Sequence, residues 1–244
     1  MLGLLRFYFA IIVMVLHLFL GVHAIGIYAV FGFYIMSGYL ITRIMHESYS
    51  YTWRGISYFI ANRCLRLYPV YWIVCLLSIG LIFYIGEDIV RGYHPQIYIP
   101  STTGSYLQNI FMAFIAWYPN EVSPRLVPPT WALAVEIFMY LLIAAGISKS
   151  FFRVKIWIFF SICYVGYSFY TGEPWGSRYY PAAAASLPFS VGAAIYFLTK
   201  NIQFKQKIKR YRLTAKKCFL MMLLNSLFFS FMYPVGASFA YDVV

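Results

Sequence analysis

Ionisable side chains interrupt the long apolar stretches of this sequence at a few places where chemistry could occur. The residues concerned are Arg6, His17, Arg63, Arg66 and Glu136. A charged Arg, Lys or Asp at the centre of a membrane helix costs about 2.5–3.5 kcal/mol, so such groups are expected to face a protein interior or a watery cavity. These five side chains are therefore the candidate functional residues.

His17 lies eleven residues after Arg6 in the stretch LLRFYFAIIVMVLH. Eleven helical steps turn the chain by about 1100°, which is three turns plus about 20°, and advance it by about 16 Å. Arg6 and His17 are therefore predicted to share one helix face. A neutral imidazole, with an ordinary pKa of about 6.5, can accept a proton at physiological pH. The alternative is a packing histidine bonded to a neighbouring helix, with Arg6 marking topology.

Arg63 and Arg66 are three residues apart, which makes them neighbours on one helix face. They stand just before a long apolar run, at the cytoplasmic edge of a predicted span. Two guanidinium groups there can bind phosphates through paired hydrogen bonds. They could equally be ordinary basic residues that contact lipid headgroups at the cytoplasmic surface. Their spacing alone does not decide between these alternatives.

Glu136 stands in the apolar run PPTWALAVEIFMY. A carboxylate there must be neutral, paired or hydrated, because an isolated buried charge is too costly. It could be a catalytic partner or a structural clasp to an arginine, and both interpretations remain open.

The elements that position these residues follow from composition. The 244 residues are 62% hydrophobic, 22% aromatic and 11% charged, with a mean hydropathy of +0.72. A soluble core of this size cannot hide so much apolar surface, so the chain is predicted to be an integral membrane protein. The net charge of +12 does not indicate nucleic-acid binding, because no polar segment is long enough to form a basic domain.

A membrane helix needs about 20 mainly apolar residues. The predicted fold is an all-α, polytopic transmembrane bundle forming a single domain over residues 1–244. Its seven predicted spans are Leu4–Gly21, Ile25–Ile44, Tyr68–Ile85, Thr130–Gly146, Ile156–Tyr170, Tyr179–Leu198 and Cys218–Phe239. The shorter stretch Tyr106–Trp117 is predicted to be a re-entrant or interfacial helix.

The distribution of basic residues supports this topology. With a cytoplasmic N-terminus, sixteen of the nineteen Lys and Arg residues fall inside, and only Arg91, Arg125 and Arg178 fall outside. The four cysteines show no CxxC pairing, so neither a disulfide framework nor a metal site is predicted.

Four segments, taken in order, are similar to motifs of the membrane-bound acyltransferase 3 family. LLRFYFAIIVMVLH resembles the family's first helix with its Arg and essential His, and VFGFYIMSGYLI resembles its Phe-x-x-Ser-Gly-Phe-Leu-Ile signature. FIANRCLRLYPVYW is similar to its Arg-x-x-Arg-x-x-Pro element, and PTWALAVEIFMY to its Trp-Ser-Leu-x-x-Glu-x-x-Phe-Tyr segment. The resemblance covers about the first 145 residues. Ala132 replaces the commoner Ser, and the family's usual ten or so spans imply that its last spans are missing here.

The resemblance implies a function and a set of roles. The family transfers an acyl group, usually acetyl, from cytoplasmic acyl-CoA to a sugar hydroxyl across the membrane. Arg63 and Arg66 would hold the phosphates of coenzyme A, and His17 would be the general base or, less favourably, an acyl carrier. Arg6 would steady the donor or the helix, and Glu136 would pair with an arginine or orient a polar group. Ser37 would simply allow close helix approach.

We therefore expect a membrane O-acetyltransferase of cell-surface or exported polysaccharide, in a bacterial plasma membrane. Its partners would be the bilayer, acyl-CoA and a carbohydrate acceptor, with no nucleic acid and no bound cofactor. Two alternatives remain. One is a polysaccharide export or carrier component, because buried His, Arg and Glu also mark transport pathways. The other is a non-catalytic remnant of such an acyltransferase.

Overall fold

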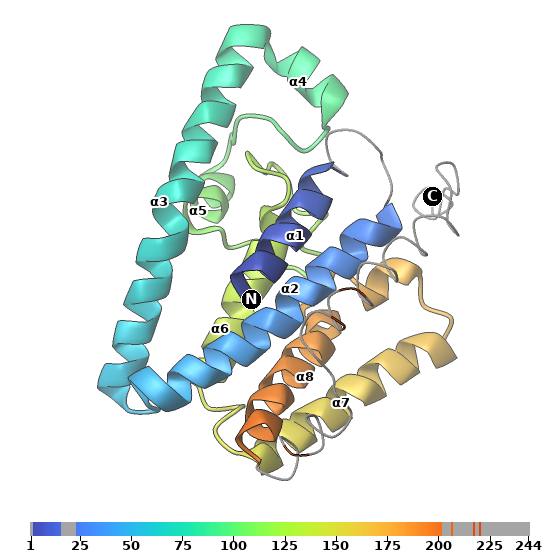
Figure 1. Cartoon of the computed structure of the whole chain (residues 1–244). Helices are drawn as coiled ribbons and strands as arrows, with labels where there is room; N and C mark the ends of the chain where they lie inside the picture. The colour runs from blue at the N-terminus through green and yellow to red at the C-terminus, as the bar shows by residue number, and fades with distance from the viewer. Residues whose placement is uncertain (1, 16–22, 202–205, 207–216, 218–219, 221–244) are drawn as a thin grey trace.

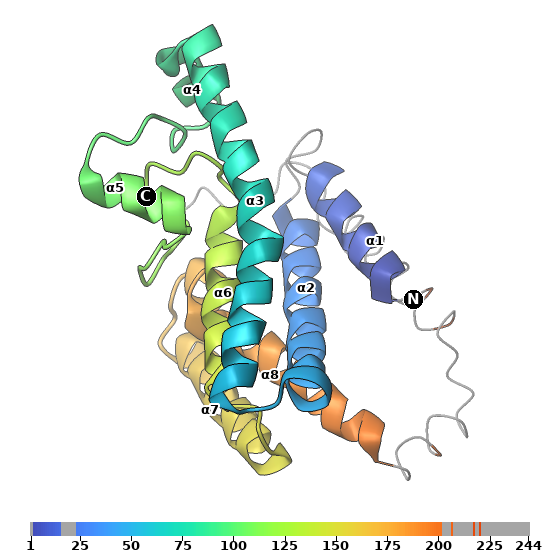
Figure 2. The ribbon, with the colours of Figure 1, turned by 90° about the vertical axis from the view of Figure 1, so that its left-hand side faces the viewer.

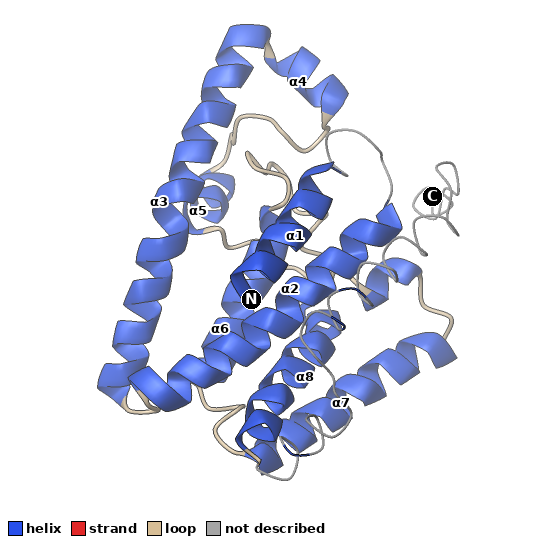
Figure 3. Ribbon diagram, viewed as in Figure 1, coloured by secondary structure: helices blue, strands red, loops and turns tan. Residues whose placement is uncertain are grey.

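The computed structural model describes residues 2–15, 23–201, 206, 217 and 220 (Figure 1). All the regular structure in this part of the chain is helical (Figure 3). The helices are α1 (Leu2–Val15), α2 (His23–Ile44), the π-helical turn η2 (Met45–Tyr49), α3 (Trp53–Ile85), α4 (Glu87–Tyr93), α5 (Thr103–Phe111), α6 (Thr130–Ala144), α7 (Phe151–Tyr170), the 3₁₀ turn η3 (Trp175–Arg178) and α8 (Ala182–Lys200). The all-α prediction is confirmed for the described residues.

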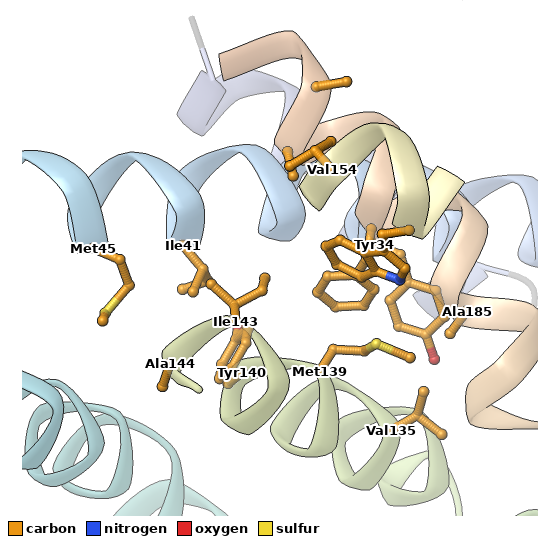
Figure 4. Close-up of a cluster of buried hydrophobic side chains, with 14 of the residues drawn as sticks. Tyr34, Ile41, Met45, Val135, Met139, Tyr140, Ile143, Ala144, Val154 and Ala185 are labelled. Carbon is orange, nitrogen blue, oxygen red and sulfur yellow. The ribbon is translucent and has the colours of Figure 1, made fainter. Parts of the chain in front are cut away.

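The closest helix pair, α2 and α8, is built on two glycines. A Cβ at Gly38 of α2 would overlap the carbonyl of Phe189, and one at Gly192 of α8 would overlap the carbonyl of Ile35. Small residues let helix backbones approach closely inside a membrane. This pair packs with α3, α6 and α7 around the largest buried apolar cluster, which includes Tyr34 and Phe189. In Figure 4 the side chains of α2 and α6 meet in this core.

One end of the bundle is held together by Ser148, in the turn between α6 and α7. Its Oγ accepts a hydrogen bond from Thr42 at 3.2 Å and pairs with the Tyr51 hydroxyl at 3.1 Å. His46 Nε2 lies 3.0 Å from the Ser148 carbonyl. We call these four residues the Ser148 cluster. At the opposite end, the hydroxyls of Tyr118 and Ser177 are 2.7 Å apart and join two connecting segments.

The helix α3 is longer than the sequence predicted. It begins at Trp53, because the Thr52 side chain accepts a hydrogen bond from the Gly55 amide, and runs for 33 residues with Pro69 inside it. The predicted span, which begins at Tyr68, is the C-terminal part of this helix. Arg63 and Arg66 precede it on the same helix, as their predicted placement on one helix face requires. The hydropathy of Tyr68–Ile85 located the apolar part correctly, but the start of the helix is set by the cap.

The stretch Tyr106–Trp117 does form a short helix and not a span. The helix α5 has nine residues, about 13 Å, against a hydrocarbon core of about 30 Å. In Figure 2, α5 lies beside α3. Its last carbonyls, on Asn109, Ile110 and Phe111, accept hydrogen bonds from three aromatic side chains of α3, namely Tyr71 at 2.5 Å, Trp72 at 2.9 Å and Tyr68 at 2.8 Å. A helix end inside a protein needs such partners because its final carbonyls have none within the helix.

Four helical segments are long and apolar enough to cross a membrane, namely Gly26–Tyr49, Trp53–Ile85, Phe151–Tyr170 and Trp175–Lys200. Two further apolar helices, in α1 and α6, are shorter. A helix of 15 residues such as α6 rises about 22 Å, less than the hydrocarbon core. A multi-pass membrane protein is thus supported, but the predicted count of seven is not confirmed. The predicted span Cys218–Phe239 lies, apart from Leu220, outside the described residues.

Candidate active site

Glu136 is the centre of a polar cluster between α2 and α6. Ser37 Oγ of α2 donates a hydrogen bond to Glu136 Oε1 at 2.5 Å, and the Tyr140 hydroxyl donates to the same oxygen. Ser37 and Tyr140 are buried, and Glu136 is half-buried. We call these three residues the Glu136 cluster. Within the described part of the chain Glu136 makes no ion pair with an arginine. Its partners there are the hydroxyls of Ser37 and Tyr140, and its role in the site stays a prediction.

The local sequence explains this arrangement. Glu136 and Tyr140 are four residues apart on α6, and that spacing places two side chains on one helix face. Ser37 and Gly38 are adjacent on α2 but have different tasks, because Gly38 receives the backbone of α8 while Ser37 contacts Glu136. The resemblance implied only close helix approach for Ser37, and its neighbour Gly38 has that role. Tyr140 was missed, although its spacing from Glu136 was a usable signal.

Arg63 approaches the cluster from α3. Its guanidinium carbon lies 5.5 Å from the centre of the Phe59 ring. It interacts electrostatically with Tyr140, Arg66 and Arg6. The Nε atoms of Arg63 and Arg6 are buried and have no hydrogen-bond partner. Two guanidinium groups from different helices therefore lie near the Glu136 cluster with donor atoms to spare.

A cleft between α3 and α6 adjoins these groups. We call it the α3–α6 cleft, and its lining residues are Phe59, Ile60, Arg63, Cys64, Leu67, Tyr68, Ile137, Tyr140 and Leu141. Its wall is almost entirely apolar, with Arg63 as the one charged residue. Arg63 and Tyr140 belong both to the cleft and to the polar region beside Glu136, so the two are continuous.

The predicted site residues thus divide into three groups. The structure brings Arg6, Arg63 and Glu136 into one region through Tyr140. Arg66 is exposed, one turn along α3 from Arg63. His17 lies outside the described residues, so the predicted face shared with Arg6 stays a prediction. Among the residues described there is no group of three or more His, Cys, Asp and Glu side chains arranged to hold a metal ion.

This arrangement has a definite chemical character. A carboxylate oxygen that already accepts two hydroxyl hydrogen bonds is held in a fixed orientation. Cationic groups with unused N–H donors suit phosphate oxygens, which accept forked hydrogen bonds from guanidinium. The region therefore combines an oriented carboxylate with a place for an anionic group.

The sequence matches the model of a known protein family. The family model Acyl_transf_3, described as an acyltransferase domain, matches residues 2–243. The chain belongs to this family. The resemblance predicted from four segments is confirmed, and the match extends well beyond those segments. Neither the curated proteins nor the solved structures that were searched gave a match.

The segments that resemble the family's motifs also supply the residues around Glu136. A chain of this acyltransferase family that is helical and has four apolar helices of spanning length is a membrane acyltransferase in general terms. Three of the four segments that carry the resemblance contribute a side chain to the Glu136 region, namely Ser37, Arg63 and Glu136. The fourth contributes Arg6.

Proposed function

We propose that this protein is an O-acyltransferase that moves an acetyl group from cytoplasmic acetyl-CoA to a sugar hydroxyl of a cell-surface or exported polysaccharide. The observation that carries the proposal is the convergence of Arg6, Arg63 and the Glu136 cluster from four helices in a chain of the acyltransferase family.

The donor would be held by the arginines. Arg63 precedes Ile85 by 22 residues, which is about 33 Å of helix and close to the hydrocarbon thickness of about 30 Å. If Ile85 marks the outer boundary of the core, Arg63 lies near the inner one, within reach of a soluble nucleotide. Arg66, which is exposed, would bind a phosphate of coenzyme A together with Arg63, and Arg6 would add positive charge beside them.

His17 would activate the acceptor. In this mechanism its neutral imidazole takes the proton of the sugar hydroxyl as the oxygen attacks the thioester carbonyl, and the thiolate of coenzyme A leaves and is then protonated. The products are the O-acetyl sugar and free coenzyme A. Glu136, fixed by Ser37 and Tyr140, would orient a polar group of the reacting complex.

The proposed location is a bacterial plasma membrane with the N-terminus in the cytoplasm. The orientation is supported by six basic residues at the end of the bundle that carries the Ser148 cluster, because basic residues gather on the cytoplasmic side. They are Arg43, Arg54, Lys149, Arg153, Lys155 and Lys200. Single cysteines placed at Arg54 and at Pro95 should label from the cytoplasmic and the external side respectively. External labelling at Arg54 would reverse the proposed orientation.

The mechanism is tested most directly at His17. His17→Gln keeps much of the volume but loses the basic imidazole, so transfer of labelled acetyl groups from acetyl-CoA to glycans in membranes should fall by about 10²- to 10⁴-fold at equal protein level. His46→Gln is the matched control and should retain activity, because His46 belongs to the Ser148 cluster.

Two results would contradict the proposal. Near-parent transfer by His17→Gln would make the histidine a packing residue. Cells that lack the gene but keep the O-acetyl content of their surface glycans, while exporting less glycan, would favour the export component.

A further inference from the structure

The α3–α6 cleft opens on the outer face of the bundle. Cys64 and Leu141, on its two walls, are both exposed. The surrounding surface of α3 is also apolar, with Leu65, Val70 and Leu77 exposed. In a bilayer this surface meets hydrocarbon chains, and a cleft whose walls are almost entirely apolar favours a chain over water.

The depth of the cleft in the membrane follows from the length of α3. Arg63 lies about 33 Å before Ile85 along the helix, close to the thickness of a hydrocarbon core. If Ile85 marks the outer boundary of the hydrocarbon core, as in the proposed topology, Arg63 lies near the inner boundary, within reach of lipid phosphates. Leu67, which lines the cleft, lies about one turn further along α3 toward Ile85.

The charge around Arg63 is positive and uncompensated. Its electrostatic neighbours include two further arginines, Arg66 and Arg6. No carboxylate forms an ion pair with Arg63 among the residues that the structure describes. Its buried Nε has no hydrogen-bond partner. A cation at this depth is expected to pair with an anionic group.

We propose that the α3–α6 cleft is a binding site for an anionic glycerophospholipid. One acyl chain lies against Leu67, Ile137 and Leu141, and the phosphate accepts hydrogen bonds from Arg63. The apolar wall selects a chain and the guanidinium selects an anionic headgroup, so neither a neutral lipid nor a soluble anion satisfies both parts. The site does not depend on the proposed function, although a donor phosphate that reaches Arg63 would displace the lipid headgroup.

The test uses the whole chain in lipid nanodiscs without coenzyme A. Two photoactivatable probes carry the same diazirine acyl chain, one on phosphatidylglycerol and the other on phosphatidylcholine. We expect adducts at Leu67, Ile137 and Leu141, with a yield about fivefold higher for the phosphatidylglycerol probe, as one basic residue near the surface provides. Arg63→Gln should lower that yield to the phosphatidylcholine level. Arg54→Gln, at the exposed start of the same helix, should leave it unchanged.

A second variant keeps the test decisive if Arg63→Gln does not fold. Leu141→Trp fills the mouth of the cleft and leaves Arg63 in place, so adducts at Leu67 should be lost with either probe. Leu77→Trp, on the exposed surface of α3, is its matched control and should have no effect.

Three outcomes of the lipid labelling would overturn the proposal. They are equal labelling by both probes, adducts at Leu77 and Phe83 as frequent as those in the cleft, and cleft labelling that persists in Leu141→Trp. Labelling of Leu67 and Leu141 by a diazirine acyl-CoA in neutral-lipid discs would instead assign the cleft to the donor and likewise overturn it.

Discussion

The Ser148 cluster and the Glu136 cluster both join helices through polar side chains, yet they differ in what they leave unpaired. Ser148 is fully buried, and its hydroxyl and carbonyl are engaged by Thr42, Tyr51 and His46. The Glu136 cluster is also hydrogen-bonded internally, but Arg63 and Arg6 beside it keep buried Nε atoms without partners.

The presence or absence of unpaired donors indicates whether a polar cluster has a structural or a chemical role. Polar groups that satisfy each other hold helices together and have nothing left for a ligand. Buried donors without partners are costly unless a ligand completes them. We therefore interpret the Ser148 cluster as a clasp and the Glu136 region as a binding and reaction site, a contrast that mutation can test.

The largest effect is expected at Glu136. In Glu136→Gln the neutral amide is a weaker acceptor for Ser37 and Tyr140 and turns N–H donors toward them. Acetyl transfer in membranes should fall about 100-fold at equal protein level. Glu47→Gln, which removes a carboxylate paired with Arg43 and Lys200 at the clasp end, should change activity less than about twofold. Equal activity in both variants would remove the distinction between the two regions.

A smaller effect is expected from Arg66→Lys. The charge is kept, but lysine cannot make the forked contact of guanidinium with phosphate. The apparent KM for acetyl-CoA should rise about tenfold with kcat little changed, because hydrogen bonds to a charged group contribute about 1.5–3 kcal/mol. Arg54→Lys, on the same helix, serves as the control. An unchanged donor KM would return Arg66 to the role of a topology marker.

The smallest effect is expected when one serine in each cluster is replaced by alanine. Ser37→Ala removes a hydrogen bond between helices and Ser148→Ala removes bonds between a turn and its neighbours. Side-chain hydrogen bonds between membrane helices contribute about 0.6 kcal/mol on average and up to about 1.7 kcal/mol. Thermal unfolding in detergent should show a similar small loss of stability for both. Only Ser37→Ala should also lower acetyl transfer, by a few fold. Loss of activity in Ser148→Ala without unfolding would show that the clasp takes part in the reaction.

Local sequence was enough for the class of protein and for the family. Apolar stretches of the required length predicted a helical membrane protein, and the predicted spans at Ile25–Ile44, Ile156–Tyr170 and Tyr179–Leu198 fall on helices of spanning length. Hydropathy predicts spans because the free energy of placing a helix in lipid is a sum over consecutive residues of that helix. The predicted span Tyr68–Ile85 also falls within such a helix, Trp53–Ile85, whose start is set fifteen residues earlier by the cap at Thr52.

The site required more than local pattern. The sequence singled out Arg6, Arg63 and Glu136 individually, because each is an ionisable group in or beside an apolar run. It did not reveal that Ser37 bonds Glu136 across 99 positions of the chain, or that Tyr140 connects this carboxylate to Arg63. Those contacts exist because Gly38 and Gly192 let α2 and α8 pack closely while α6 packs against both helices around the same buried cluster. Residue type and spacing determined which groups are costly to bury, whereas only the packing of helices decided which of them meet, since pairing depends on distance in space.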